Sequence, residues 1–270
     1  MSLVSHPPLR LIVAFSMLIS WSFAADSGFQ AATCEGIYKR HVQGICTDAQ
    51  DAIYWSWTDA IVKTDRQGHI LRQVQAPDHQ GDLCHVEGKL YVAVNLGKFN
   101  QPAGAADSWV FVYDSDSLAE LARYPVPEVV HGAGGMAYRN GHFYIVGGLP
   151  PGADGNEVYE YDASFKLVKR HALASGYTLM GIQTVEYAEG AWWFGCYGKP
   201  AVLLRADEAF QMTGRWEINA SVGIATLGQG RFLIAENLVG PDKRNTARVK
   251  LARADAQQGL IFEAPIPASP

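Results

Sequence analysis

The chain has few charged side chains and no excess of basic ones. Asp, Glu, Lys and Arg make up 18% of the 270 residues, and 22 Lys and Arg stand against 27 Asp and Glu, which gives a net charge of −5. Nucleic-acid-binding proteins usually present a basic surface, so this composition argues against a nucleic-acid partner. Hydrophobic residues reach 48%, which excludes a globally disordered chain.

The sequence also lacks the short motifs of several common enzyme classes. It contains no G-x-S-x-G nucleophile elbow, no H-E-x-x-H zinc motif, no phosphate-binding P-loop and no EF-hand loop. Its four cysteines, Cys34, Cys46, Cys84 and Cys196, form no C-x-x-C pair, which disfavours a thiolate zinc site. Two alternatives remain open for them: disulfides, with Cys34 and Cys46 the closest pair in the sequence, or buried free thiols.

Only one long apolar stretch is present, and it lies at the N-terminus. Residues 11–23 follow Arg10, and Ser22 and Ala24 are the small residues expected before a cleavage site at Ala25. This layout predicts a secretory signal peptide over residues 1–24, because the stretch is shorter than the ~20 apolar residues that a spanning helix needs. We therefore expect a periplasmic or secreted protein, with one domain over 25–270 and no membrane association after cleavage.

The rest of the chain carries an internal repeat. An apolar segment ends in Asp and is followed by a turn and a second apolar segment, at spacings of 45 to 49 residues. The five aspartates are Asp65, Asp114, Asp162, Asp207 and Asp255. An Asp in such a turn accepts hydrogen bonds from the backbone two residues further on, so we interpret these aspartates as structural.

A second pattern lies between the aspartates. A segment led by Gly is followed by a tight turn and an aromatic segment, as in GGMAYRNGHFYIVG at 134–147 and GIATLGQGRFLIAE at 223–236. Each unit offers four strands in about 45 residues, which is typical of β-propeller blades. The sequence predicts an all-β fold, a five-bladed β-propeller with four antiparallel strands per blade. Either segment 34–41 or the C-terminal segment 260–265 would close the ring.

Histidines occupy matching places before two of the blades. In a propeller, the connections between blades and the loops between second and third strands lie on one face, around the central channel. His41 and His131 stand at such connections in the first and third units, and Asp78, His79 and Asp82 lie near the matching place in the second. We consider His41, His131 and Asp82 candidate acid–base groups, and His41, His131 and Asp78 candidate ligands of one divalent metal ion. Alternatively, each histidine caps a strand end.

Other residues near this face are candidates for binding a small-molecule, peptide or glycan ligand. The set comprises Gln43, His79, Gln80, Gln183, Lys98 and Tyr197. Long loops at 95–108 and 237–245 bring Phe99 and Asn237 to the same face. Tyr197 and Trp57 are candidates for stacking on a sugar or peptide group, whereas we assign Trp192 and Trp193 to packing between blades.

Several segments carry a family resemblance. These are QGI (43–45), GKLYVAV (88–94), FVYDSDSLAEL (111–121) and VEYAEGAWW (185–193). Over most of residues 40–220, the chain resembles the five-bladed glutaminyl cyclotransferases of the plant and bacterial type. That family converts the N-terminal glutamine of peptides to pyroglutamate. The resemblance implies the propeller fold, and Gln43 with Gly44 matches a Gln-Gly pair of the family's first blade.

At three positions the chain departs from the family pattern. Gln80 stands where the family carries a glutamate, Gln183 where it carries an asparagine, and Ala133 where it carries a tryptophan. The glutamate matters most, because the transfer needs a group that moves a proton.

Three functions therefore remain open. The first is an exported enzyme that acts on a small polar substrate through His41 and His131. The second is a non-catalytic propeller that binds a glycan, a peptide or a protein. The third is the cyclotransferase itself, which we rank below the others because of Gln80.

Overall fold

The computed structural model describes residues 28–264, so the predicted signal peptide at 1–24 lies outside the described residues. Within the described range the chain forms twenty-one β-strands and no helix. Consequently this part of the chain contains no helix with the length and apolarity needed to cross a membrane.

Four of the five sheets each contain four consecutive strands in antiparallel order. The first comprises β2 (Val42–Thr47), β3 (Ala52–Trp57), β4 (Ala60–Asp65) and β5 (Ile70–Gln75). The second comprises β6 (Gln80–Val86), β7 (Lys89–Asn95), β8 (Ser108–Asp114) and β9 (Glu120–Pro125). The third comprises β10 (Ala133–Arg139), β11 (His142–Gly147), β12 (Asn156–Tyr161) and β13 (Leu167–Leu173). The fourth comprises β14 (Leu179–Ala188), β15 (Ala191–Tyr197), β16 (Val202–Ala206) and β17 (Met212–Trp216).

The fifth sheet joins the two ends of the chain. It contains β18 (Ile224–Gly228), β19 (Arg231–Val239) and β20 (Asn245–Asp255). Both β1 (Ala32–Tyr38) and β21 (Gly259–Phe262) pair with the outer side of β20. The first half of β20 pairs with β1 and the second half with β21, so the two terminal segments that the sequence left as alternatives share one edge.

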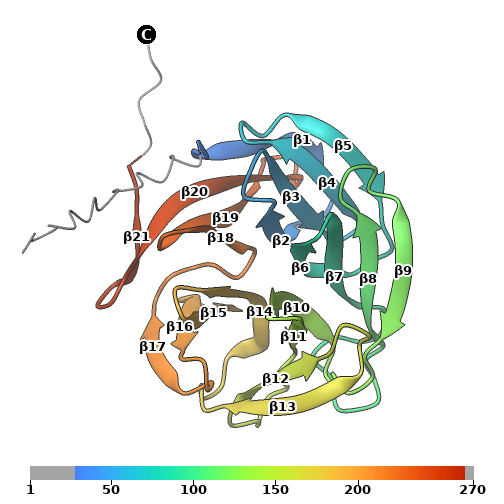
Figure 1. Cartoon of the computed structure of the whole chain (residues 1–270), viewed down its shortest axis with the longest axis vertical. Helices are drawn as coiled ribbons and strands as arrows, with labels where there is room; N and C mark the ends of the chain where they lie inside the picture. Colours follow the sequence, from blue (N-terminus) through green and yellow to red (C-terminus); the bar gives the residue numbers. More distant parts are fainter. Residues whose placement is uncertain (1–27, 265–270) are drawn as a thin grey trace, which may run out of the picture.

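Figure 1 shows the five sheets arranged around a common centre, with β2, β6, β10, β14 and β18 nearest to it. The predicted all-β, five-bladed propeller with four antiparallel strands per blade is therefore confirmed.

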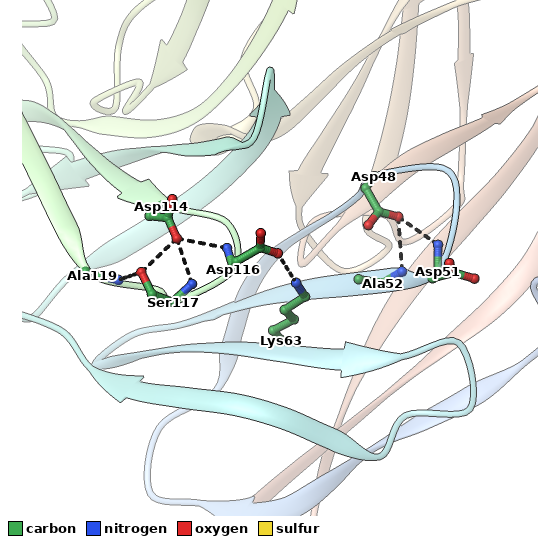
Figure 2. Close-up of polar contacts among 8 residues, drawn as sticks. All are labelled: Asp48, Asp51, Ala52, Lys63, Asp114, Asp116, Ser117 and Ala119. Carbon is green, nitrogen blue, oxygen red and sulfur yellow. Dashed lines mark hydrogen bonds and ion pairs between the residues drawn. The ribbon is translucent and has the colours of Figure 1, made fainter.

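The repeated aspartates hold the turns between third and fourth strands. Asp114 Oδ1 accepts hydrogen bonds from the backbone N–H groups of Asp116 and Ser117, and Figure 2 shows both contacts. Asp65, Asp162, Asp207 and Asp255 accept equivalent bonds from residues two to four positions further on. The structural interpretation of these aspartates is confirmed.

Aromatic side chains fill the spaces between neighbouring blades. Trp192 packs against Tyr144 of the third blade, and Trp193 packs against Phe232 of the fifth, as expected for these two residues. Trp57 is fully buried and stacks on Tyr38 of β1, with ring centroids 3.7 Å apart. The prediction that Trp57 stacks on a ligand is wrong, because the closing strand covers its ring.

The inner strands of neighbouring blades approach one another closely. A Cβ on Gly81 would collide with the carbonyl oxygen of Gly134 on the next blade. A Cβ on Gly135 would lie 2.6 Å from the carbonyl oxygen of Gln183. Glycine at these places allows backbone contact between adjacent inner strands.

The four cysteines are free. Cys34, Cys46 and Cys196 are buried, and Cys84 is half-buried. The sequence left disulfides and free thiols open as alternatives, and the structure shows free thiols.

Candidate functional site

A hollow of about 540 Å³ occupies the mouth of the channel, within the usual size range of small-ligand sites. The connections that precede the inner strands form part of its wall, at His41, His79 and Val222. The ends of second strands and the loop after β7 add Tyr197 and Phe99, and the inner strands themselves supply most of the remaining residues. The structure thus places both kinds of connection on one face, as propeller geometry predicts.

The surface of this hollow is mainly apolar, and the polar side chains in its wall include no Asp, Glu, Lys or Arg. Its polar groups are five carboxamides, two imidazoles and one phenol. They belong to Gln43, Gln80, Gln183, Asn95, Asn237, His41, His79 and Tyr197. Carboxamides both donate and accept hydrogen bonds without adding charge, so the hollow is suited to an uncharged polar group.

His41, Tyr197 and Gln43 form a contact group on one side. Tyr197 Oη lies 3.4 Å from His41 Nε2 and 3.4 Å from Gln43 Oε1. Gln43 Nε2 donates a hydrogen bond to Thr58 Oγ1, and this hydroxyl donates to the backbone oxygen of His41. Thr58 therefore supports both side chains from behind.

Burial sets the protonation of this group. Loss of hydration lowers the pKa of His41, and it raises the pKa of Tyr197 to about 12. At neutral pH, His41 is therefore an uncharged imidazole able to take up a proton, and Tyr197 keeps its hydroxyl proton.

Gln80 is locked in place by its neighbours. Its Nε2 donates to the carbonyl oxygen of Pro77 at 2.8 Å, and its Oε1 accepts from Tyr113 Oη at 3.2 Å. Both ends of the carboxamide are thus engaged within the protein, although the residue lines the hollow.

Gln183 is engaged at one end only. Its Nε2 donates to the carbonyl oxygen of Met180 at 2.7 Å. Its Oε1 has no hydrogen-bond partner within residues 28–264 and is available as an acceptor at the wall of the hollow.

Asn237 and Asn95 hold the surrounding backbone. Asn237 Oδ1 accepts from the N–H of Val42, and Asn95 Oδ1 accepts from the N–H of Asp107. These two carboxamides fix the entry of β2 and the long loop after β7.

Asp82 lies below the hollow rather than in its wall. Its side chain reaches from β6 across the axis to β14, where Oδ2 accepts from the N–H of Val185 at 3.1 Å. Oδ1 is buried and has no partner in the described chain. Burial, partly opposed by backbone hydrogen bonds, raises the pKa of Asp82 well above its ordinary value. Asp82 is 1% exposed and is not among the residues that line the hollow, and its acid–base role stays a prediction.

The predicted set of His41, His131 and Asp78 does not come together. His131 lines a separate hollow, and its Nδ1 lies 2.9 Å from the carbonyl oxygen of Gln101. Phe99 packs on Gly132, the residue between His131 and the start of β10. Asp78 is half exposed and does not line the mouth. No group of three His, Cys, Asp or Glu within residues 28–264 is arranged to hold a metal ion, so the convergence expected of these residues is not found.

The remaining predicted residues divide in a simple way. Gln43, His79, Gln80, Gln183 and Tyr197 line the hollow together with His41, whereas Lys98 is exposed on the loop after β7 and does not. Their roles stay predictions. The sequence analysis did not identify Asn95 or Met180 as residues of the site. Asn95 ends the second strand of its blade and Met180 lies at the start of an inner strand, and these positions in the repeat could have indicated them.

Comparisons with known proteins show the fold. No family model matches the sequence, and no curated protein matches it. Among solved structures, the chain is similar to the crystal structure of Myxococcus xanthus glutaminyl cyclase, with a TM-score of 0.57 and 14% sequence identity. The match covers 86% of this chain and 96% of that one, so the likeness extends over nearly the whole propeller.

Proposed function

We propose that the hollow binds the uncharged, carboxamide-bearing end of a small peptide. The observation that carries this proposal is Gln183 Oε1, a free acceptor in a wall that has no side chain of Asp, Glu, Lys or Arg. A charged group placed there would lose its hydration without gaining an ion pair, whereas a carboxamide would exchange one set of hydrogen bonds for another.

The first candidate ligand is a peptide with an N-terminal glutamine. The likeness of the fold to a glutaminyl cyclase supports this choice, and so does Gln183 Oε1, an acceptor for the N–H of a ligand carboxamide. In the reaction, the α-amine of the peptide, in its neutral form, attacks the side-chain carboxamide carbon, and its nitrogen then gives up a proton to His41 Nε2. The C–N bond to the leaving group then breaks, and His41 returns the proton so that ammonia departs.

His41 takes this role because it is a half-buried, uncharged base at the wall, and Tyr197 orients it. Gln80 cannot move a proton, and Asp82 is closed off below the hollow.

The test uses purified protein and the dipeptide Gln-Gly-amide, with pyroglutamyl product and ammonia measured by mass spectrometry and an ammonia assay. His41→Ala is expected to reduce the rate by roughly 10²-fold or more, the usual effect of losing a proton-transfer group. His69→Ala, at an exposed histidine that contacts only Asp65 in a turn, is the matched control and should keep full activity. A wild-type protein that forms no product, or a His41→Ala variant with unchanged rate, contradicts the catalytic proposal.

A second candidate is a propeller that binds such a peptide without reacting with it. The observation that favours it is Gln80, whose carboxamide is held at both ends where the resembling family carries an acid. Binding of the dipeptide without product formation, in wild type and His41→Ala alike, would select this alternative.

We also propose that the protein is exported. The support is the sequence alone: the apolar stretch at 11–23 and the small residues before Ala25. The intact mass of the protein recovered from the cell exterior or periplasm should correspond to a chain that starts at Ala25. Recovery of the full-length chain from the cytoplasm would contradict export.

A further inference from the structure

The start of β14 and the two residues before it expose three large apolar side chains within four residues. Tyr177 is 43% exposed, Leu179 47% and Met180 36%. We call these three residues the apolar rim. Apolar side chains gathered on a protein surface indicate a binding site more often than isolated ones do.

The apolar rim adjoins the mouth of the channel. Met180 lines the hollow, and Leu179 pairs in register with Tyr197, which also lines it. Phe99 adds a further apolar side chain to the same wall. A ligand that fills the hollow and extends out of it on this side therefore meets Met180 and Leu179, and Tyr177 precedes Leu179 by two residues.

The segment is anchored from within. Between the exposed residues, Thr178 is buried and its Oγ1 accepts a hydrogen bond from Asn156 Nδ2 at 2.9 Å. The same Asn156 amide donates to Ser175 Oγ at 2.8 Å. Tyr177 and Leu179 are consequently held outward by a fixed backbone.

Met180 has an unusual backbone conformation. Its φ is +60°, and it is the one non-glycine residue with positive φ inside a strand of the described chain, since the others lie in turns or loops. Such a conformation is unfavourable for a residue with a Cβ. The hydrogen bond from Gln183 to the carbonyl oxygen of Met180 secures it, so the conformation of the rim and the placement of Gln183 are linked. Strained residues of this kind concentrate at ligand sites.

From these observations we infer that the apolar rim binds the second side chain of the peptide ligand and selects a large apolar residue there. This inference rests on the proposed function, in which the hollow takes the first residue. The wall of the hollow binds that residue through polar groups, and the peptide chain then crosses its edge beside Met180 and Leu179. The ligand class is therefore a peptide with glutamine first and an aromatic or aliphatic residue second.

The test measures binding by isothermal titration calorimetry, using peptides that cannot react. Des-amino Gln-Phe-amide and des-amino Gln-Gly-amide lack the attacking α-amine. Wild type is expected to bind the Phe ligand roughly tenfold more tightly, because the ring buries apolar surface on the rim. The double variant Tyr177→Ser/Leu179→Ser should lose this preference and keep its affinity for the Gly ligand. Leu121→Ser, at an exposed apolar residue of the outer strand β9, is the control and should behave as wild type.

The outcomes separate the two proposals. Equal affinity of wild type for both ligands, or a preference that survives in the double variant, overturns the role of the apolar rim and leaves the proposed function standing. If neither ligand binds to the wild-type protein, the proposed function is contradicted, and this inference with it. Both substituted side chains are exposed, and an unchanged melting temperature of the double variant would confirm that it is folded.

Discussion

At the scale of single residues, the half-buried imidazole of His41 is uncharged, and thus present as the base, at neutral pH. Burial, as the largest effect, lowers the pKa of His41 below its usual 6.5. The base form is the uncharged one, so it persists as the pH falls until that lowered pKa is reached. The α-amine of the peptide, with an ordinary pKa of about 7.7–8.0, must also be neutral to attack, so the acid limb of kcat/KM follows the substrate as well as the enzyme. We therefore expect the imidazole of His41 itself to titrate with a midpoint below pH 6.5. A proton NMR titration of the His41 ring, assigned with His41→Ala, tests this, and a midpoint above that value would contradict it.

Glu186 gives a second prediction, concerning stability. Its half-buried carboxylate accepts hydrogen bonds from the N–H groups of Tyr187 and Thr226, the latter on the fifth blade. Burial outweighs these bonds and raises the pKa of Glu186 from 4.5 to about 7. The native state therefore binds the proton more strongly than the unfolded chain, so this contribution is complete below pH 4.5 and is lost as the pH rises through about 7.

Replacing this carboxylate removes the pH-dependent loss. Glu186→Gln should gain about 1–2 kcal/mol over wild type at pH near 8 and little at pH near 4, measured by urea unfolding. Glu189→Gln is the matched control, because its exposed side chain also accepts an N–H from the fifth blade, at Gly230. An equal gain at both pH values would show that the titration of Glu186 is not responsible.

Residue patterns in the sequence predicted the turns better than the site. The aspartate turns depend on backbone only a few positions away, so their spacing was sufficient. The distance between His41 and His131 depends on the loop after β7, where Phe99 packs on Gly132, and no local pattern encodes that contact. Asp82 was found by its position in the repeat, but its burial across the axis depends on Gly44 and Gly135 in other blades.

At the scale of elements, the hairpin between β2 and β3 depends on one side chain. Asp48 Oδ1 accepts hydrogen bonds from the N–H groups of Gln50, Asp51 and Ala52, two of which Figure 2 shows. Burial alone would raise the pKa of Asp48, but these bonds outweigh it and lower the pKa.

Loss of these bonds should weaken the first blade. Asp48→Ala is expected to reduce the free energy of unfolding by about 1 kcal/mol, because three N–H groups lose their protein acceptor to water. Asp48→Asn keeps an acceptor oxygen and should lose less. Denaturant unfolding of the two variants measures this, and equal losses would contradict the role of the acceptor.

Figure 2 also shows how one blade is tied to the next. Lys63 Nζ, on β4, lies 2.8 Å from Asp116 Oδ1 in the turn of the second blade. The apolar pattern of the sequence indicated the strands on which these residues lie. It did not indicate which surface residues of two neighbouring blades meet, because that depends on how the sheets are stacked.

At the scale of the whole molecule, the ring is closed by β1. Tyr38 stacks on Trp57 of the first blade, and its Oη donates to the carbonyl oxygen of Glu35 at 2.9 Å. The sequence placed both terminal segments at this edge but treated them as competitors. Their sharing of β20 follows from its length of 11 residues, since each terminal strand is shorter.

The closure can be tested at Tyr38. Tyr38→Ala should reduce the free energy of unfolding by about 3 kcal/mol, the usual cost of deleting a buried aromatic ring. Tyr38→Phe loses only the hydroxyl and should cost about 1 kcal/mol. Hydrogen exchange should quicken in both β3 and β20 in the Ala variant. Quickening in β1 alone would indicate that the terminal strand frays without opening the ring.

The central claim is that the mouth of the channel accepts an uncharged carboxamide and rejects the matching carboxylate. Calorimetric titration with des-amino Gln-Gly-amide and des-amino Glu-Gly-amide, which differ only in that group, tests it most directly at neutral pH. We expect the carboxamide ligand to bind at least roughly tenfold more tightly, because the wall offers a carboxylate no cationic side chain of Lys or Arg. Equal affinity, or tighter binding of the carboxylate, would contradict the account.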